Sequence, residues 1–452
     1  MNNLNFLVDV LKESPVFKTL EKNVKPGRTV CASGLSTINK SNIIYALCHL
    51  KGVTAFCLAS DEKEAQTLCN DLSCMGLRAY VYPVRDFNFL DFQSRSHEYE
   101  HARLKVLLKL LNHECDVAIA CVDAAAQLTV PRNVLEQSVI EFEEGRELSL
   151  EKATKALTLL GYERFDAVEG SGQFSLRGGI LDFFMPDSDY PVRCEFWGDE
   201  ITDLSYFDIE TQRRFKKADK ITLSPSTEIV IEDRAALADK IEHKAKLLRS
   251  KNSAKAKEKL FSEAELIRSG AMIANADKFI NQIYDKPESL FDYLDRNTLV
   301  FASEFTAIQE RGKSMDFISN ETLMQGFEDG TLCRGFDRFA LTFNECTEFL
   351  QSHGTIVLEN FVHGSMPIKL SEIISFSTKQ LSAWGGSYKQ LKEDVDGLFT
   401  PESKGVIFAG TERAAKNLCD TFNADGINAV YSEGADKISK GELLVMQGAL
   451  SA

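Results

Sequence analysis

The chain has 452 residues, of which 26% are charged and 44% hydrophobic, and it carries a net charge of −15. This composition is typical of a globular protein of three or four domains. The excess of acidic residues argues against a protein whose main task is to grip nucleic-acid phosphates. No apolar run approaches the ~20 residues of a membrane-spanning helix, so we expect a cytoplasmic protein without membrane contact.

The eleven cysteines form no C-x-x-C pair, and most lie in apolar stretches such as 53–60 and 116–123. Disulfide frameworks and zinc sites usually show paired or regularly spaced cysteines. The pattern therefore predicts reduced, buried thiols.

A near-match to a phosphate-binding loop occurs early in the chain, at 34–41 (GLSTINKS). The pattern G-x-x-x-x-G-K-[ST] is met except that Asn39 replaces the second glycine. That glycine lets the backbone wrap its N–H groups around phosphates in conformations that a Cβ obstructs. A short buried strand at 28–34 and a helix at 41–50 are expected to flank the loop, so the surroundings suit a nucleotide site and the altered residue argues against one.

Short apolar strands and helical patterns alternate from residue 1 to about 132. Such alternation is typical of βαβ units on a parallel sheet. The strands are expected at 53–60, 79–84 and 116–123, and the helices at 61–72 and 101–112.

The stretch 97–101 (HEYEH) matches the zinc pattern H-E-x-x-H. On a helix His97 and His101 would face the same way, and Glu98 could act as a general base. A catalytic zinc needs a third protein ligand, and His113 follows twelve residues later without the glycine-containing spacer of the metzincins. We therefore interpret the acidic residues as the first turn of a helix and expect no bound metal.

Residues 133–224 change to period-two strands and turns, with one strand at 172–185 and a second at 190–201. Alternate side chains of a strand share a face. The core face is then formed by Val192, Cys194 and Phe196, and the opposite face presents Arg177, Arg193 and Trp197. Two interpretations are open: a surface tryptophan stabilised by arginine stems, or the centre of a protein interface, where Trp and Arg are enriched.

Helices return after residue 225 and begin with a long basic one. The run 239–260 holds eight Lys and Arg residues against three acids, which indicates a solvated helical face or, less favoured because aromatic residues are absent, a nucleic-acid patch. Strands are expected at 298–303, 371–377 and 405–411, with a helix at 412–426. The final stretch, 442–452 (ELLVMQGALSA), is expected to form a strand and has no ending signal, so we expect the natural chain to continue beyond Ala452.

The sequence thus predicts an α/β multidomain chain. The expected sections are an α/β section of βαβ units at 1–132, a small antiparallel α+β unit at 133–224, a helical section with the basic helix at 225–355, and a small α/β section at 356–452, which we expect to be truncated.

Residues 172–214 resemble the module shared by bacterial UvrB and the transcription-repair coupling factors. The family pattern R-G-x-[IL]-[LVI]-D-[ILF]-[FY]-P is met at 177–186, with Met185 as one extra residue before the proline. The patterns P-x-R-x-[ED]-F-[FW], D-E-I and F-[DN]-x-x-[ST]-Q-R follow in order. Stretches 82–93 and 116–131 also resemble the family's first domain, so the resemblance covers roughly residues 10–355.

Three departures of this chain from the UvrB pattern decide between UvrB and the coupling factors. UvrB needs an intact P-loop, a D-E-x-H-type acidic motif and a tyrosine-rich hairpin. Here Asn39 alters the loop, Ser303 stands where a magnesium-positioning Asp is needed, and the segment after Asp86 is too short for the hairpin. The resemblance therefore implies the N-terminal region of a coupling factor, with Gly34, Asn39, Lys40 and Ser41 as a loop that binds no nucleotide. It also implies a degenerate P-loop-like (RecA-like) α/β domain in two parts, 1–132 and 225–355, which is split by the small antiparallel α+β insert at 133–224 and followed by the small α/β domain at 356–452.

In this family the inserted domain docks on UvrA, and the contact residues carry over to Arg177, Arg193 and Trp197, where the aromatic is often Phe. All three side chains are expected to project into solvent, so that replacing any of them leaves the melting temperature nearly unchanged. The implied role is an adaptor that recruits UvrA to a stalled RNA polymerase in nucleotide excision repair.

The resemblance also implies that this part of the chain has no catalytic residues and no cofactor. ATP, magnesium, double-stranded DNA and RNA polymerase would belong to later domains of a full-length ATP-dependent translocase, whose contacts could mask the UvrA-binding face. The alternatives are an active UvrB-like DNA-dependent ATPase or helicase subunit, and a DNA-binding module that uses 239–260.

Overall fold

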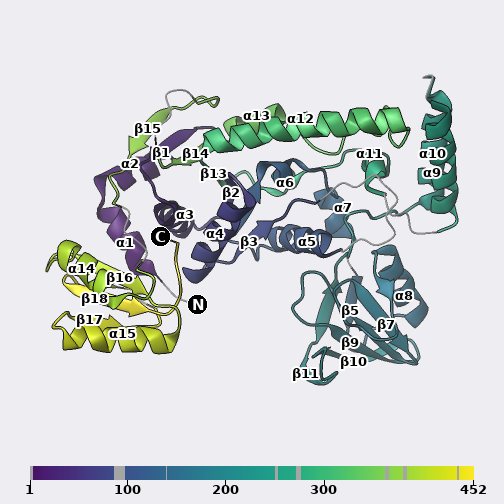
Figure 1. Cartoon of the computed structure of the whole chain (residues 1–452). Helices are drawn as coiled ribbons and strands as arrows, with labels where there is room; N and C mark the ends of the chain where they lie inside the picture. The colour runs from purple at the N-terminus through teal and green to yellow at the C-terminus, as the bar shows by residue number, and fades with distance from the viewer. Residues whose placement is uncertain are drawn as a thin grey trace.

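The structure is a computed structural model that describes residues 4–85, 97–138, 140–249, 253–270, 276–361, 366–379, 384–434 and 437–451. It contains a large parallel sheet, an antiparallel sheet inserted into that fold, and a small parallel sheet near the C-terminus. In Figure 1 the antiparallel sheet and the small sheet form two lobes at opposite ends below the large sheet. None of the helices among the described residues has the length and apolar character that crossing a membrane requires.

The large sheet has seven strands in the order β15-β1-β14-β13-β2-β4-β3, and all of its pairs are parallel. Most of its strands are buried along their whole length, as is expected when helices cover both faces. The strands are β1 (Val30–Ser33), β2 (Ala55–Ala59), β3 (Ala79–Tyr82), β4 (Val117–Cys121), β13 (Leu299–Ser303), β14 (Thr355–Glu359) and β15 (Glu372–Ser375).

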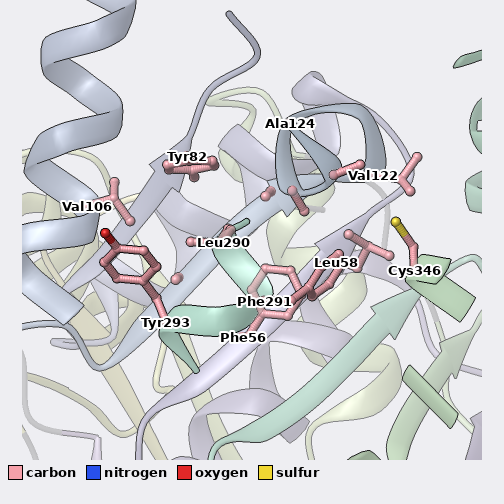
Figure 2. Packing of buried hydrophobic residues seen from close by; sticks show 14 of the residues in the cluster. Phe56, Leu58, Tyr82, Val106, Val122, Ala124, Leu290, Phe291, Tyr293 and Cys346 are labelled. Carbon is pink, nitrogen blue, oxygen red and sulfur yellow. The ribbon is translucent and has the colours of Figure 1, made fainter. Parts of the chain in front are cut away.

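Alternate residues of these strands enter two separate hydrophobic clusters, one on each face. One face is covered by α1 (Asn5–Glu13), α2 (Pro15–Asn23), α3 (Thr37–Lys51) and α4 (Glu62–Cys74). The helices that contribute to the other cluster include α5 (Glu98–Leu111), α6 (Val122–Ala126), α7 (Arg132–Gln137), α11 (Ile280–Ile283), η2 (Leu290–Tyr293), α12 (Phe305–Asp329) and α13 (Phe343–His353). Figure 2 shows this second cluster, where Phe56 of β2 meets Phe291 edge to face with 5.7 Å between ring centroids.

The strand expected at 371–377 does not belong to the small C-terminal domain. It is β15, and it pairs with β1 so that Ile374 lies opposite Ala32. The sequence of a short apolar strand does not indicate which strand it pairs with. The pattern therefore could not predict that β15 pairs with β1, the first strand of the chain. The small domain has its own parallel sheet in the order β16-β18-β17. Its elements are α14 (Tyr388–Leu398), β16 (Lys404–Phe408), α15 (Glu412–Ala424), β17 (Ala429–Tyr431) and β18 (Glu442–Met446).

The inserted antiparallel unit follows α7. Its six strands lie in the order β11-β10-β9-β8-β7-β6, and neighbouring strands are antiparallel except β6 and β7, which are parallel. Their core face packs with α8 (Leu150–Leu159). They are β6 (Glu163–Arg164), β7 (Gln173–Arg177), β8 (Ile180–Phe183), β9 (Val192–Trp197), β10 (Glu200–Phe207) and β11 (Arg214–Lys217). Strands β5 (Ile140–Glu143) and β12 (Lys220–Leu223) pair where the chain enters and leaves the unit.

The single strand expected at 172–185 is in fact the hairpin of β7 and β8. The chain reverses at Gly178, whose φ of +62° suits glycine, and Gly179. A Cβ at Gly179 would lie 2.7 Å from the carbonyl oxygen of Phe196, so this turn passes directly against β9. The consequence is that β8 becomes a strand in its own right between β7 and β9.

The basic run forms part of a helical hairpin, α9 (Arg234–Leu247) and α10 (Ser253–Arg268), rather than one long helix. A 3-10 turn, η1 (Ala276–Phe279), follows. Three cations of the run are engaged within the protein: Lys240 pairs with Asp285 and Lys246 with Glu242, and the Lys244 ammonium lies 5.4 Å from the ring of Phe336. These contacts favour the interpretation as a solvated helical face.

A buried ionic cluster joins the exit of the inserted unit to α5. Arg103 and Glu228 are both fully buried, with 2.6 Å between Arg103 Nε and Glu228 Oε1. Thr129 also donates to Glu228 at 2.8 Å. The Arg85 guanidinium lies 3.8 Å from Glu228 and 3.0 Å from Asp277. We call these five residues the ionic cluster.

Glu100 extends this joint at the start of α5, where it accepts hydrogen bonds from His97 and from the backbone N–H of Glu228. Burial by itself raises the pKa of Glu100, but these hydrogen bonds and the charge of Arg85 outweigh it and hold the pKa at about 2. A carboxylate with a lowered folded pKa stabilises the fold above its unfolded pKa, and this contribution is lost as the pH falls through the folded pKa.

We therefore predict that Glu100 contributes stability above about pH 4.5 that is lost between about pH 4.5 and 2. The measurement is the melting temperature of the parent and of Glu100→Gln across this range. The difference between the two should shrink as the pH falls. A difference that stays constant from pH 6 to pH 2 would contradict the prediction.

Candidate functional site: the polar face of the inserted sheet

The strand register brings the three candidate residues to one face of the inserted sheet. Arg177 at the end of β7 lies opposite Ile180, and Ile180 lies opposite Glu195 on β9. Residues directly opposite in adjacent strands project from the same side. Glu195 shares its face with Arg193 and Trp197, so the predicted grouping of Arg177, Arg193 and Trp197 on one side is confirmed. We call this side the polar face; it comprises Arg177, Ile180, Asp182, Arg193, Glu195 and Trp197.

Trp197 and Arg177 are exposed, as predicted. The tryptophan is 82% exposed at the end of β9, and the Arg177 side chain is 49% exposed at the end of β7. A hollow beside the tryptophan is lined by Gly179, Ile180, Glu195, Phe196, Trp197 and Thr202. An exposed indole beside a hollow is a suitable anchor for a protein partner.

Arg193 does not project into solvent, and that expectation is wrong. Its side chain is only 13% exposed. Its Nε and Nη2 atoms each lie 2.8 Å from an oxygen of Asp182, and both terminal nitrogens reach Gln212 at 3.2 Å. The guanidinium carbon also lies 4.4 Å from the ring centre of buried Phe207, so Arg193 stacks there and not on Trp197.

Asp182 on β8 explains this arrangement, and the sequence reasoning missed it. Its side chain is 1% exposed and lies directly opposite Arg193. It also accepts a hydrogen bond from Arg177, with 2.7 Å between Arg177 Nη2 and Asp182 Oδ2. Recognising the turn at Gly178 and Gly179 would have placed this carboxylate between the two arginines.

A further arginine, Arg214 of β11, extends the charges beyond the polar face. It pairs with Glu195 and with Asp203, the latter at 2.9 Å. Each of these arginines thus has an acidic partner within the sheet. The surface is therefore not an open cationic patch.

The loop at 34–41 has a different geometry from a phosphate cradle. Helix α3 begins at Thr37 with Ser36 as its N-cap, so Asn39, Lys40 and Ser41 lie within the helix. The Asn39 side chain donates to Ser36 Oγ at 2.9 Å. The backbone of Phe376 passes directly over the Cα of Gly34, where a Cβ would collide with its carbonyl oxygen.

Lys40, which would contact phosphates in an intact loop, is 3% exposed and contacts carboxylates. Its ammonium lies 2.5 Å from Glu304 and 3.2 Å from Glu64, and it donates to Ser303 Oγ at 2.9 Å. Carboxylates therefore surround the lysine that would contact phosphates in an intact loop. Ser41 Oγ bonds to buried Asp71 at 3.0 Å.

We predict that the chain does not bind ATP with magnesium, because phosphates would have to displace two carboxylates from Lys40. Titration calorimetry with MgATP should show no binding up to millimolar ATP. Micromolar binding that is lost in Lys40→Ala would contradict this expectation.

The HEYEH stretch lies beside the inserted unit. The imidazole rings of His97 and His101 are stacked with 5.9 Å between their centroids, and His97 Nδ1 bonds to Glu100 at 2.9 Å. In the part of the chain that the structure describes, no group of three or more His, Cys, Asp or Glu side chains is arranged to hold a metal. That His97 and His101 bind no zinc stays a prediction, and stoichiometric zinc that is lost in His97→Ala would contradict it.

The predicted segment at 82–93 extends beyond residue 85 into 86–96, which lies outside the described residues, so the expected absence of a hairpin after Asp86 remains a prediction. Ser303 lies at the end of β13, next to Lys40, as an acidic-motif position should.

The inserted unit also matches a known family. Residues 140–229 match a family model described as the UvrB interaction domain. This range begins with β5, includes the whole antiparallel sheet and ends next to Glu228 of the ionic cluster. Residues 140–229 are a UvrB interaction domain. The polar face, with Arg177, Asp182, Arg193 and Trp197, lies entirely within the UvrB interaction domain.

The whole chain is similar to the transcription-repair-coupling factors. It is 25% identical to that of Bacillus subtilis (strain 168) over 98% of this chain and 38% of the relative. It is also 25% identical to that of Staphylococcus epidermidis (strain ATCC 12228 / FDA PCI 1200) over 82% of this chain and 32% of the relative. The chain thus spans less than two fifths of these relatives, and the similarity continues on both sides of the UvrB interaction domain. The resemblance to the UvrB-like region of the coupling factors is confirmed.

Proposed function

We propose that the chain is an adaptor in transcription-coupled DNA repair whose UvrB interaction domain binds UvrA through the polar face. The observation that carries this proposal is the exposed Trp197 beside exposed Arg177 on a domain of this family. Trp and Arg are enriched among the residues that dominate the energetics of protein interfaces, and here both are exposed on the same face of one sheet.

The proposal extends to the longer protein in which such a region would act. There the adaptor would link UvrA to a stalled RNA polymerase in the bacterial cytoplasm, and later domains would supply ATP-driven movement on double-stranded DNA. Two features make the chain itself a poor candidate for the ATPase: the carboxylates around Lys40, and Ser303 in place of a metal-binding Asp. Within the basic run, Lys240 and Lys246 are paired with Asp285 and Glu242, which does not favour a DNA-binding module.

The test is titration calorimetry of the chain with purified UvrA. Binding is expected, and Trp197→Ala should weaken it by roughly 30-fold or more, since truncating an aromatic hot spot typically costs at least ~2 kcal/mol. Phe317→Ala is the matched control, because Phe317 is a 65% exposed aromatic on α12, outside the UvrB interaction domain. Absence of binding by the parent chain, or equal affinity of Trp197→Ala, would refute the proposal.

A further inference from the structure

Asp182 is the most buried charged group beneath the polar face, and its position suggests more than a structural role. We infer that Asp182 is a positioning residue, which holds the Arg177 guanidinium in the orientation that a carboxylate of the docking partner requires. This inference rests on the proposed function and adds to it the chemistry of the contact. It assigns the direct charged contact to Arg177 alone.

The burial of Asp182 excludes direct contact with a partner. With 1% of its side chain exposed, the carboxylate acts only through the groups that bond to it. Its Oδ1 atom accepts from Arg193 Nε at 2.8 Å. Its Oδ2 atom accepts from both Arg193 Nη2 at 2.8 Å and Arg177 Nη2 at 2.7 Å. One carboxylate on β8 thus fixes both arginines, which lie on the flanking strands β7 and β9.

The two arginines differ in how many N–H donors remain available to a partner. Arg193 uses its Nε and both terminal nitrogens on Asp182 and Gln212, and only 13% of its side chain is exposed. Arg177 bonds to Asp182 through one terminal nitrogen, and about half of its side chain faces solvent. A guanidinium has five N–H donors in a planar fork, so Arg177 retains an edge that can bind a carboxylate through two hydrogen bonds.

The formal charges around Asp182 are also consistent with a single charged contact to the partner. Arg177 and Arg193 carry two positive charges against the one negative charge of Asp182, and Glu195 on the same face is paired with Arg214. One carboxylate of a partner would therefore balance the excess charge around Asp182. The hollow beside Trp197 lies across the strand register from Arg177, through Ile180 and Glu195. The matching partner segment therefore presents one carboxylate next to an apolar side chain.

A double-mutant cycle with UvrA tests this inference. Arg177→Ala should weaken binding by roughly 30-fold and Asp182→Asn by roughly tenfold. The double variant should bind within about twofold of Arg177→Ala alone, because Asp182 acts through Arg177. Losses that multiply in the double variant would overturn the inference. So would tighter binding by Asp182→Asn, which is expected if the carboxylate only repels an acidic partner.

Asp203→Asn is the matched control. It removes a carboxylate from the neighbouring strand β10 whose partner is Arg214, and binding should stay within about twofold of the parent. Because Asp182→Asn removes a buried charge, Arg177→Lys provides a second test that keeps the charge but loses the fork. It should weaken binding about as much as Arg177→Ala, and parental affinity would overturn the inference. If the parent chain does not bind UvrA, the proposed function is refuted. If the parent binds UvrA but the affinity losses of Arg177→Ala and Asp182→Asn multiply in the double variant, only the positioning role of Asp182 is refuted.

Discussion

Glu228→Gln is expected to lower the free energy of unfolding by about 3–5 kcal/mol, the range seen when one partner of a buried ion pair is removed. The substitution keeps the shape of the side chain but leaves fully buried Arg103 without its counter-ion at 2.6 Å. Arg85 also loses one of the carboxylates that neutralise its charge. The change in urea midpoint, together with hydrogen exchange of the α5 amides, measures the effect.

Glu232→Gln is the control for this prediction, because Glu232 is an exposed acid four residues further along. Its effect on the urea midpoint should be within about 0.5 kcal/mol. If Glu228→Gln were no more destabilising than Glu232→Gln, the ionic cluster would not hold the inserted unit against α5.

Arg193→Ala is expected to destabilise the UvrB interaction domain by about 2–4 kcal/mol. It removes two hydrogen bonds from the buried carboxylate of Asp182 and uncovers the ring of Phe207. Arg177→Ala should cost less than about 1 kcal/mol, because the Arg177 side chain is half exposed and Arg193 still neutralises Asp182.

Hydrogen exchange of the β8 and β9 amides separates these two variants. Faster exchange is expected in Arg193→Ala and near-parental exchange in Arg177→Ala. Equal protection in both variants would show that Arg193 has no structural role and would restore the sequence-based expectation that both arginines are simply exposed.

The alternation of side chains along 190–201 was sufficient to predict which residues face the core. Period two is a property of a single strand, so Val192, Cys194 and Phe196 could be assigned without knowing any neighbour. Trp197 followed from the same rule. The exposure of Arg193 did not, because it depends on Asp182, a residue on a different strand that the sequence reasoning had merged with β7.

The same limit explains the other differences. The presence of Asn39 in place of the second glycine could be recognised in the sequence as a change in the loop. The carboxylates of Glu64 and Glu304 could not be predicted near Lys40, because they come from distant parts of the chain. The pairing of β15 with β1 joins residues more than 300 positions apart. Local patterns predict the elements and their faces, whereas partners that meet only in the folded chain leave no local signal.

The ionic cluster also has a mechanical consequence. The UvrB interaction domain is connected to the large sheet by its entry and exit segments. The ionic cluster lies at the exit segment, and it resists sliding of the domain because any shift separates opposite charges in the buried interior. A pull on a partner that is docked at the polar face should therefore be transmitted to the large sheet and not absorbed by a soft hinge. An adaptor with such a stiff arm would convert displacement of the main body directly into displacement of its cargo.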